Sequence, residues 1–159
     1  MPVRTPTPSP CPNHQYAEDG VYAVTLTVTT TDGRTDSASR IVPVRTHDVA
    51  IVSVDVPKIG VVGSTRTVSV YVASGDYTEN VHVYLLRSVP GGFETVDLQT
   101  QTIPASTTAA FRFAYTFTSS DASLGTIAFQ AHAVITDHVD PIPADNVLTS
   151  ANVKVVGKR

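Results

Sequence analysis

Alternation between apolar and polar residues is the feature of this sequence that most restricts its fold. After Gly20, every second position is apolar, and the positions between them hold small or hydroxyl residues. We call the apolar set the hairpin face; it consists of Tyr22, Val24, Leu26 and Val28. This period of two indicates a strand with one buried face. Val and Thr are the two most frequent residue types, and both favour strands over helices. The sequence therefore predicts an all-β protein.

The alternating segment is the first half of a predicted β-hairpin. Asp32-Gly33 is a turn signal, and residues 37–44 predict a second strand in which Pro43 indicates an edge or a strand end. Two strands alone do not form a stable domain in water. We therefore expect the hairpin face to pack on another surface, and we take it as the predicted assembly interface.

The rest of the chain divides into β-branched and aromatic segments separated by turn residues. Seven strands in about 110 residues is typical of an immunoglobulin-like β-sandwich. No interval is long or periodic enough to predict a helix. The predicted strands are 48–56, 65–73, 81–87, 93–98, 109–118, 126–135 and 147–156.

The same alternation predicts which side chains form the core of the sandwich. The chain has no Trp and a single Cys, so an aromatic row on residues 111–117 must supply the bulk. The predicted core set is Val68, Val70, Val72, Val81, Val83, Leu85, Phe111, Phe113, Tyr115, Phe117, Ile127, Phe129, Ala131, Ala133 and Ile135.

Three regions follow from these patterns. Residues 1–12 carry five prolines and predict an extended, polyproline-like arm. Residues 13–45 hold the hairpin, and residues 47–157 hold the sandwich. The connection between the last two is short, so we expect the hairpin to find its packing partner elsewhere than on its own sandwich.

The hairpin region resembles the last third of a PKD (polycystic kidney disease) domain, an immunoglobulin-like surface module. The early strands of that family are missing, so the resemblance implies a partial PKD-like hairpin over about residues 11–44. Its Gly-x-Tyr step at Gly20 is that of a tyrosine corner, which fixes how the chain enters the strand. The matching positions are His14, Tyr16, Gly20, Tyr22, Val24, Leu26, Val28 and the Asp32-Gly33 turn.

Residues 47–157 resemble a CARDB-type domain of prokaryotic surface proteins. The resemblance rests on the opening 47–51 (HDVAI), on the turn at Gly63 before a Val-rich strand, and on the closing stretch 145–155. Ser74-Gly75-Asp76 replaces the Asn-x-Gly turn usual after the second strand. Tandem modules of these two kinds imply an extracellular or cell-surface location, and roles in adhesion, spacing or assembly without catalysis.

Charge and hydropathy exclude several classes of partner. The net charge is −3, the isoelectric point is about 5.9, and no cluster of Lys or Arg occurs, so we expect no binding to nucleic acid. No apolar run approaches the roughly 20 residues of a membrane span, so we expect no membrane insertion. Cys11 cannot form a disulfide within one copy; it could join two copies or remain a spare thiol.

The acidic stretch near the end of the chain is the weak metal candidate. Asp137, Asp140 and Asp145, with Asn146, offer oxygen ligands of the kind that Ca²⁺ prefers, although their spacing matches no calcium-loop motif. We favour the other interpretation, a solvated loop with Asx turns. No cofactor is predicted.

Histidines and nucleophiles offer little for catalysis. His82 and His132 share the outward parity of neighbouring strands and could pair on the surface, but a metal site there lacks further ligands. We interpret His14 and His47 as packing or turn residues at module ends. No nucleophile-elbow motif occurs, and Cys11 lies in the proline-rich arm, so we expect no enzyme activity.

These observations predict a non-catalytic extracellular structural or assembly protein. The sharper hypothesis is a subunit of a cell-surface polymer or filament held by strand addition, because a half-module with open strand edges needs completion. The other is a fragment of a larger surface protein. We therefore expect self-association or neighbouring modules of a surface protein as partners. The alternative class is an adhesion or carbohydrate-binding module appended to a secreted enzyme, which would need a cleft lined by exposed aromatic residues.

Overall fold

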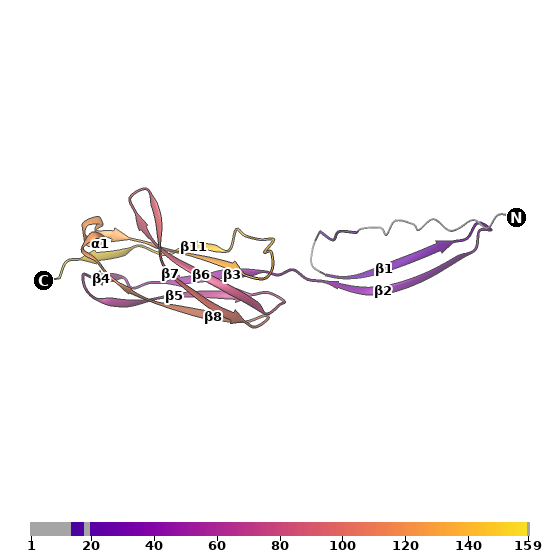
Figure 1. The fold of residues 1–159 in the computed structure, drawn as a ribbon, viewed down its shortest axis with the longest axis horizontal. Helices are drawn as coiled ribbons and strands as arrows, with labels where there is room; N and C mark the ends of the chain where they lie inside the picture. Colours follow the sequence, from indigo (N-terminus) through magenta and orange to yellow (C-terminus); the bar gives the residue numbers. More distant parts are fainter. Residues whose placement is uncertain (1–13, 18–19, 159) are drawn as a thin grey trace. The chain divides into compact units, whose positions relative to one another are not determined.

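The computed structural model describes residues 14–17 and 20–158 (Figure 1). The chain divides into two compact units, Met1–Arg45 and Thr46–Arg159. The described part consists of strands connected by turns and loops, with one six-residue α-helix. The predicted all-β class is therefore confirmed.

The first unit contains the predicted hairpin, strands β1 (Gly20–Thr29) and β2 (Thr35–Val44), which pair antiparallel over their whole length. At the turn, the Thr30 amide donates to the Arg34 carbonyl at 2.8 Å. Gly33 has φ of +85°, a conformation that glycine adopts without steric cost. The turn signal in the sequence thus marks the place where the chain reverses.

The second unit is a sandwich of three sheets (Figure 1). The four-stranded sheet has the order β11-β10-β6-β7, and the three-stranded sheets have the orders β3-β5-β8 and β4-β12-β9. Inward residues of β6 and β10 share one buried core with those of β5 and β8. The elements are β3 (Val49–Asp55), β4 (Ile59–Val61), β5 (Thr65–Ser74), β6 (Glu79–Val89), β7 (Gly92–Ile103), β8 (Thr108–Thr116), α1 (Ser119–Leu124), β9 (Thr126–Ile127), β10 (Phe129–Ile135), β11 (Val147–Thr149) and β12 (Val153–Val156).

The core matches the alternation of the sequence. Every side chain of the predicted core set is buried. Phe111, Phe113, Phe117 and Phe129 are the largest fully buried side chains, so the aromatic row supplies the bulk as predicted. Tyr115 belongs to this row, and its ring meets those of Phe117 and Phe129 at 5.2 and 4.9 Å in edge-to-face geometry.

Strand β4 is not predicted by the sequence, which carries turn residues there. It forms because β12 pairs with it in parallel, which is a long-range contact. Gly60 makes the close approach possible, since a Cβ atom at this position would come within 2.4 Å of the Phe117 ring. The glycine thus allows a short strand to pack on the core between the predicted strands 48–56 and 65–73, where no strand was predicted.

Helix α1 also corrects the expectation that no interval is helical. A capping box starts it: the Thr118 hydroxyl accepts from the Asp121 amide at 3.2 Å, and the Asp121 carboxylate accepts from the Thr118 amide at 2.8 Å. Gly125, with φ of +75°, ends it. Among the described residues, no helix has the length and apolar character needed to cross a bilayer.

Two predicted strands, 126–135 and 147–156, are each divided in the structure. Strand β9 pairs with β12, whereas β10 pairs with β6 and β11. The chain changes sheet at Ala128, whose amide donates to the Ser88 hydroxyl at 2.9 Å. The Ser150 hydroxyl likewise accepts from the Phe129 amide at 2.9 Å. One continuous apolar pattern in the sequence therefore contributes strands to two different sheets, and the alternation of residues alone does not show where the chain changes sheet.

Candidate functional site

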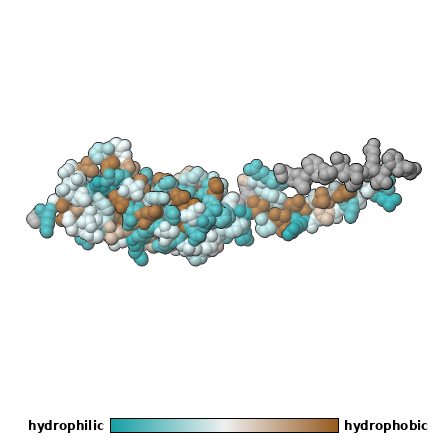
Figure 2. All heavy atoms as spheres, viewed as in Figure 1, coloured by the Kyte–Doolittle hydropathy of each residue, from teal (hydrophilic) through white to brown (hydrophobic). Residues whose placement is uncertain are grey.

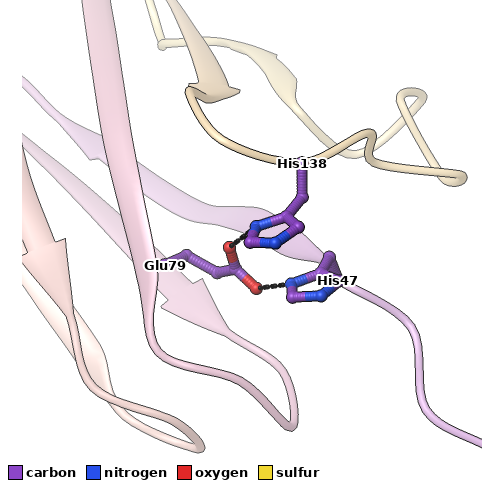
Figure 3. A group of neighbouring side chains, drawn as sticks. All are labelled: His47, Glu79 and His138. Atoms are coloured by element: carbon purple, nitrogen blue, oxygen red, sulfur yellow. Dashed lines mark hydrogen bonds and ion pairs between the residues drawn. The ribbon is translucent and has the colours of Figure 1, made fainter.

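Three polar side chains from distant parts of the chain meet at one end of the sandwich (Figure 3). His47 lies just before β3, Glu79 is the first residue of β6, and His138 lies in the loop between β10 and β11. One potential ligand atom from each lies within 4.8 Å of the other two. We call these three residues the histidine–glutamate cluster.

The geometry of the cluster is centred on the carboxylate. His47 Nδ1 lies 2.6 Å from Glu79 Oε1, and His138 Nδ1 lies 3.8 Å from Glu79 Oε2. The two imidazole rings are parallel, with centroids 3.6 Å apart and an interplanar angle of 5°. Tyr77 stacks on His47 as well, at 4.3 Å, so it must occupy the other face of that ring.

Burial differs sharply within the cluster. Glu79 is 1% exposed, whereas the side chains of His47 and His138 are 28% and 48% exposed. Glu79 Oε2 has no hydrogen-bond partner in the part of the chain that the structure describes. A buried carboxylate oxygen left in this state costs free energy, so the cluster is an uncommon arrangement for a purely structural contact.

Sequence reasoning identified only part of this cluster. His47 was interpreted as a packing or turn residue, and neither Glu79 nor His138 was singled out. Glu79 did carry a signal, because it shares the inward parity of Val81 and Val83. A carboxylate on an apolar parity is a candidate buried charge. His138 carried no comparable signal.

The weak calcium candidates Asp137, Asp140 and Asp145 lie in the loop between β10 and β11. Asp140 Oδ1 accepts from the Ile142 amide at 2.8 Å, which is an Asx turn, and its Oδ2 accepts from the Val49 amide at 3.2 Å. These bonds fix the loop against the start of β3. The structure thus places Asp140 in the Asx turn that we favoured.

The other two aspartates point to different partners. Asp137 Oδ2 accepts from the Asn80 amide group at 2.7 Å, and this bond lowers the pKa of Asp137. The Asp145 carbonyl accepts from the Ile51 amide at 2.9 Å. Within the described ranges, the three predicted aspartates do not form a group of metal-binding size.

His82 and His132 lie on neighbouring strands, β6 and β10, as predicted. They are diagonal rather than opposite, because His132 pairs with Tyr84 and His82 pairs with Val134. Neither belongs to the histidine–glutamate cluster. Cys11 lies outside the described residues.

The predicted assembly interface forms one side of β1. Val24, Leu26 and Val28 are 43%, 63% and 54% exposed, and Figure 2 shows apolar surface along the hairpin. On the opposite side, hydroxyl groups bond across the strands, among them Thr27 to Ser37 at 2.8 Å. The side of β1 that carries Val24, Leu26 and Val28 is thus exposed, and across the strands it faces Arg40, Ala38 and Asp36 of β2. The opposite side carries the hydroxyl pairs together with the exposed Val21 and Ile41.

At the amino end of the hairpin, three rings pack on one another. His14 meets Tyr16 edge-on at 4.6 Å, and Tyr16 lies 4.3 Å from Tyr22. A Cβ atom on Gly20 would lie 3.2 Å from the Tyr22 ring, so the Gly-x-Tyr step lets this ring lie close to the backbone. His14 thus packs at the end of its unit. With Ala23 and Val24, these rings line an open pocket.

A second buried carboxylate, Asp121, stabilises the sandwich. It is fully buried, accepts a hydrogen bond from the Tyr115 hydroxyl at 2.9 Å, and pairs with the Arg87 guanidinium. Burial opposes its ionisation, but the bonds from Thr118 and Tyr115 and the charge of Arg87 hold the pKa of Asp121 below its usual value. Burial and this carboxylate raise the pKa of Tyr115 to about 12.

The lowered pKa of Asp121 predicts a pH dependence of stability. An unfolded Asp titrates near pH 3.9, so the stabilisation is complete above about pH 4 and is lost as the pH falls through the lower folded-state pKa. Thermal unfolding from pH 7 to 2 should show wild type losing its advantage over Asp121→Asn in this acidic range. A difference that stays constant to pH 2 would mean that folding does not lower the pKa of Asp121.

Comparisons with known proteins give a fold. No family model and no curated protein matches the sequence. The chain is similar to the CARDB domain of a Pyrococcus furiosus protein, whose structure is a complex with di-metal ions. The TM-score is 0.55 and the sequence identity 18%, and the match covers 69% of this chain and 89% of that one. A Listeria innocua β-glucosidase matches at a TM-score of 0.47 and 14% identity, over 79% of this chain and 17% of the enzyme. The chain thus contains a CARDB-like immunoglobulin fold, and the PKD-like character of the hairpin stays a prediction.

Proposed function

We propose that this chain is a non-catalytic structural subunit of a cell-surface assembly, in which further copies of the chain complete its hairpin by strand addition. The observation that carries the proposal is the exposed apolar side of a two-stranded sheet. The immunoglobulin-like sandwich supports the structural role, because this architecture recurs in cell-surface domains.

The hairpin face has a physical reason to be covered. Leu26 is 63% exposed, and its neighbours Val24 and Val28 are about half exposed. Each aliphatic side chain of this size that moves from water into an interface contributes about 1.5–3 kcal/mol. An isolated two-stranded hairpin is marginally stable at best. Covering this face would therefore stabilise the hairpin and the assembly together.

Among the described residues β1 pairs with β2 alone, and its outer edge is the more suitable place for an added strand. In a two-stranded sheet each strand leaves one row of backbone groups without a strand partner. Strand β2 contains Asp36, Arg40 and Pro43, which are residue types that discourage edge pairing. Strand β1 contains neither a charged residue nor a proline. An edge of this kind favours pairing with another chain.

The expected result is association that depends on the hairpin face. Sedimentation velocity of the intact chain should show a larger species that grows with protein concentration. Leu26→Lys should abolish it, because a charge would lie within the covered face. Thr27→Lys is the matched control, with the same charge on the same strand but on the opposite side, and it should retain association.

Two outcomes would contradict self-assembly. One is a wild-type chain that remains monomeric at the highest attainable concentration. The other is association that Leu26→Lys and Thr27→Lys reduce equally, since the hairpin face would then have no special role. Either result would favour the other hypothesis, in which strands of a longer surface protein cover this face.

A further inference from the structure

We propose that the histidine–glutamate cluster is a binding site for one divalent transition-metal ion, with Zn²⁺ as the best match. The donors are two imidazole nitrogens and one carboxylate oxygen, contributed by His47, His138 and Glu79. Imidazole nitrogen with carboxylate oxygen suits Zn²⁺, Ni²⁺ and Cu²⁺, whereas Ca²⁺ takes oxygen ligands. Three protein ligands with an open fourth position is a common arrangement for zinc.

The strongest argument for a cation is that Glu79 Oε2, although buried, has no hydrogen-bond partner among the described residues. The carboxylate is 1% exposed, and the described residues that form ion pairs with it are the two histidines. A metal ion at this point would bind both imidazoles and place a positive charge beside the buried carboxylate.

The separations in the cluster are close to those of a coordinated ion. Ligands about 2.0–2.1 Å from a tetrahedral Zn²⁺ lie roughly 3.3 Å from one another. The distances from His47 Nδ1 to Glu79 Oε1, 2.6 Å, and from His138 Nδ1 to Glu79 Oε2, 3.8 Å, lie on either side of that value, and they involve the two different oxygens of the carboxylate. The rings must tilt out of their stack to aim both lone pairs at one point. Their partial exposure leaves room for this rotation and for entry of the ion.

The segments that carry Glu79 and His138 are bonded to each other, so these two ligands are held near one another. Asn80, which follows Glu79, accepts from the Thr136 amide through its carbonyl at 2.9 Å. Its side-chain amide donates to Asp137, the residue before His138, at 2.7 Å.

The consequence is a cross-link within the second unit. The three ligands belong to the start of β3, the start of β6 and the loop after β10. An ion that binds only the folded state stabilises it by mass action. It would fasten the loop between β10 and β11 to one end of the sandwich, next to the connection that leads to the hairpin in the sequence.

The test uses the intact chain, stripped with a chelator and desalted, with Zn²⁺ as the probe. Calorimetric titration should show one ion per chain, and thermal unfolding should shift upward by several degrees. Ca²⁺ at the same concentration should leave the melting temperature unchanged. In Co²⁺-loaded protein, visible absorption bands should report a tetrahedral site with nitrogen and oxygen ligands.

Variants separate this site from adventitious binding to surface histidines. His138→Ala and Glu79→Gln should each weaken Zn²⁺ binding at least tenfold and remove the thermal shift. His138 is half exposed, so its replacement leaves the fold intact even if Glu79→Gln is unstable. His132→Ala is the matched control, since this histidine is exposed on β10 and outside the cluster, and it should bind as wild type does.

The proposal is overturned by either of two results. Absence of a Zn²⁺-dependent heat and thermal shift in the wild-type chain would show that the cluster holds no ion. Binding that survives in His138→Ala, or that falls equally in His132→Ala, would show that Zn²⁺ attaches to surface histidines at large. Neither result depends on the hairpin, so this test is independent of the proposed assembly.

Discussion

Replacing Phe113 with alanine is expected to lower the free energy of unfolding of the sandwich by about 3–5 kcal/mol. Phe113 is 1% exposed and lies in the middle of β8, opposite Val68 of β5. Its ring fills the space between the two layers, and the surrounding side chains can only partly collapse into the cavity that alanine would leave. Denaturant unfolding followed by circular dichroism measures the change.

The neighbouring residue provides the control. Arg112 follows the opposite parity on β8 and is exposed, so Arg112→Ala should change stability by about 0.5 kcal/mol or less. The two variants differ by one position, and a one-residue register shift would exchange the faces of the strand. Equal effects of the two substitutions would therefore contradict the register of β8.

The second large effect is expected for Asp121→Ala, which should cost about 3 kcal/mol. Its carboxylate is fully buried, pairs with the Arg87 guanidinium, and accepts hydrogen bonds from the Tyr115 hydroxyl and the Thr118 amide. Removing it leaves the largely buried Arg87 with only the half-exposed Glu94 as a partner, and it leaves the Tyr115 hydroxyl and the Thr118 amide without theirs, which is far more costly than losing a surface pair. Thermal and denaturant unfolding at pH 7 provide the measurement.

Glu94 is the matched control for Asp121. It pairs with the same guanidinium, and Arg87 Nε lies 2.6 Å from Glu94 Oε1, but the Glu94 side chain is 49% exposed. Glu94→Ala should therefore cost less than about 1 kcal/mol. If it proved as costly as Asp121→Ala, the importance of the network would lie in the guanidinium and not in the buried carboxylate.

The core could be predicted from the sequence because its signal is local. On strands such as β5 and β8, burial follows the period of two, and residues such as Val70 and Phe111 belong to the inward parity whichever strands pair. The Asp32-Gly33 turn is equally local. Strand β4 and the sheet change at Ala128 could not be predicted, since both depend on where β12 and β10 lie in the folded chain.

The histidine–glutamate cluster could be predicted from local sequence patterns only in part. The parity of Glu79 marked it as a charge on a buried face, but nothing near it in the sequence identified which groups would meet it. His47 and His138 reach it from the start of β3 and from the loop after β10. Candidates chosen by proximity in the sequence, such as Asp137 and Asp140, took other partners.

The sequence by itself determined the all-β class, the hairpin with its apolar side and the set of core residues, because alternation and turn chemistry act between near neighbours. Only the tertiary structure decided that Glu79 is buried beside two stacked imidazoles and that Asp121 joins Tyr115 to Arg87. These contacts depend on the register and stacking of strands far apart in the chain. Loop closure and side-chain packing set that register, and no local period encodes it.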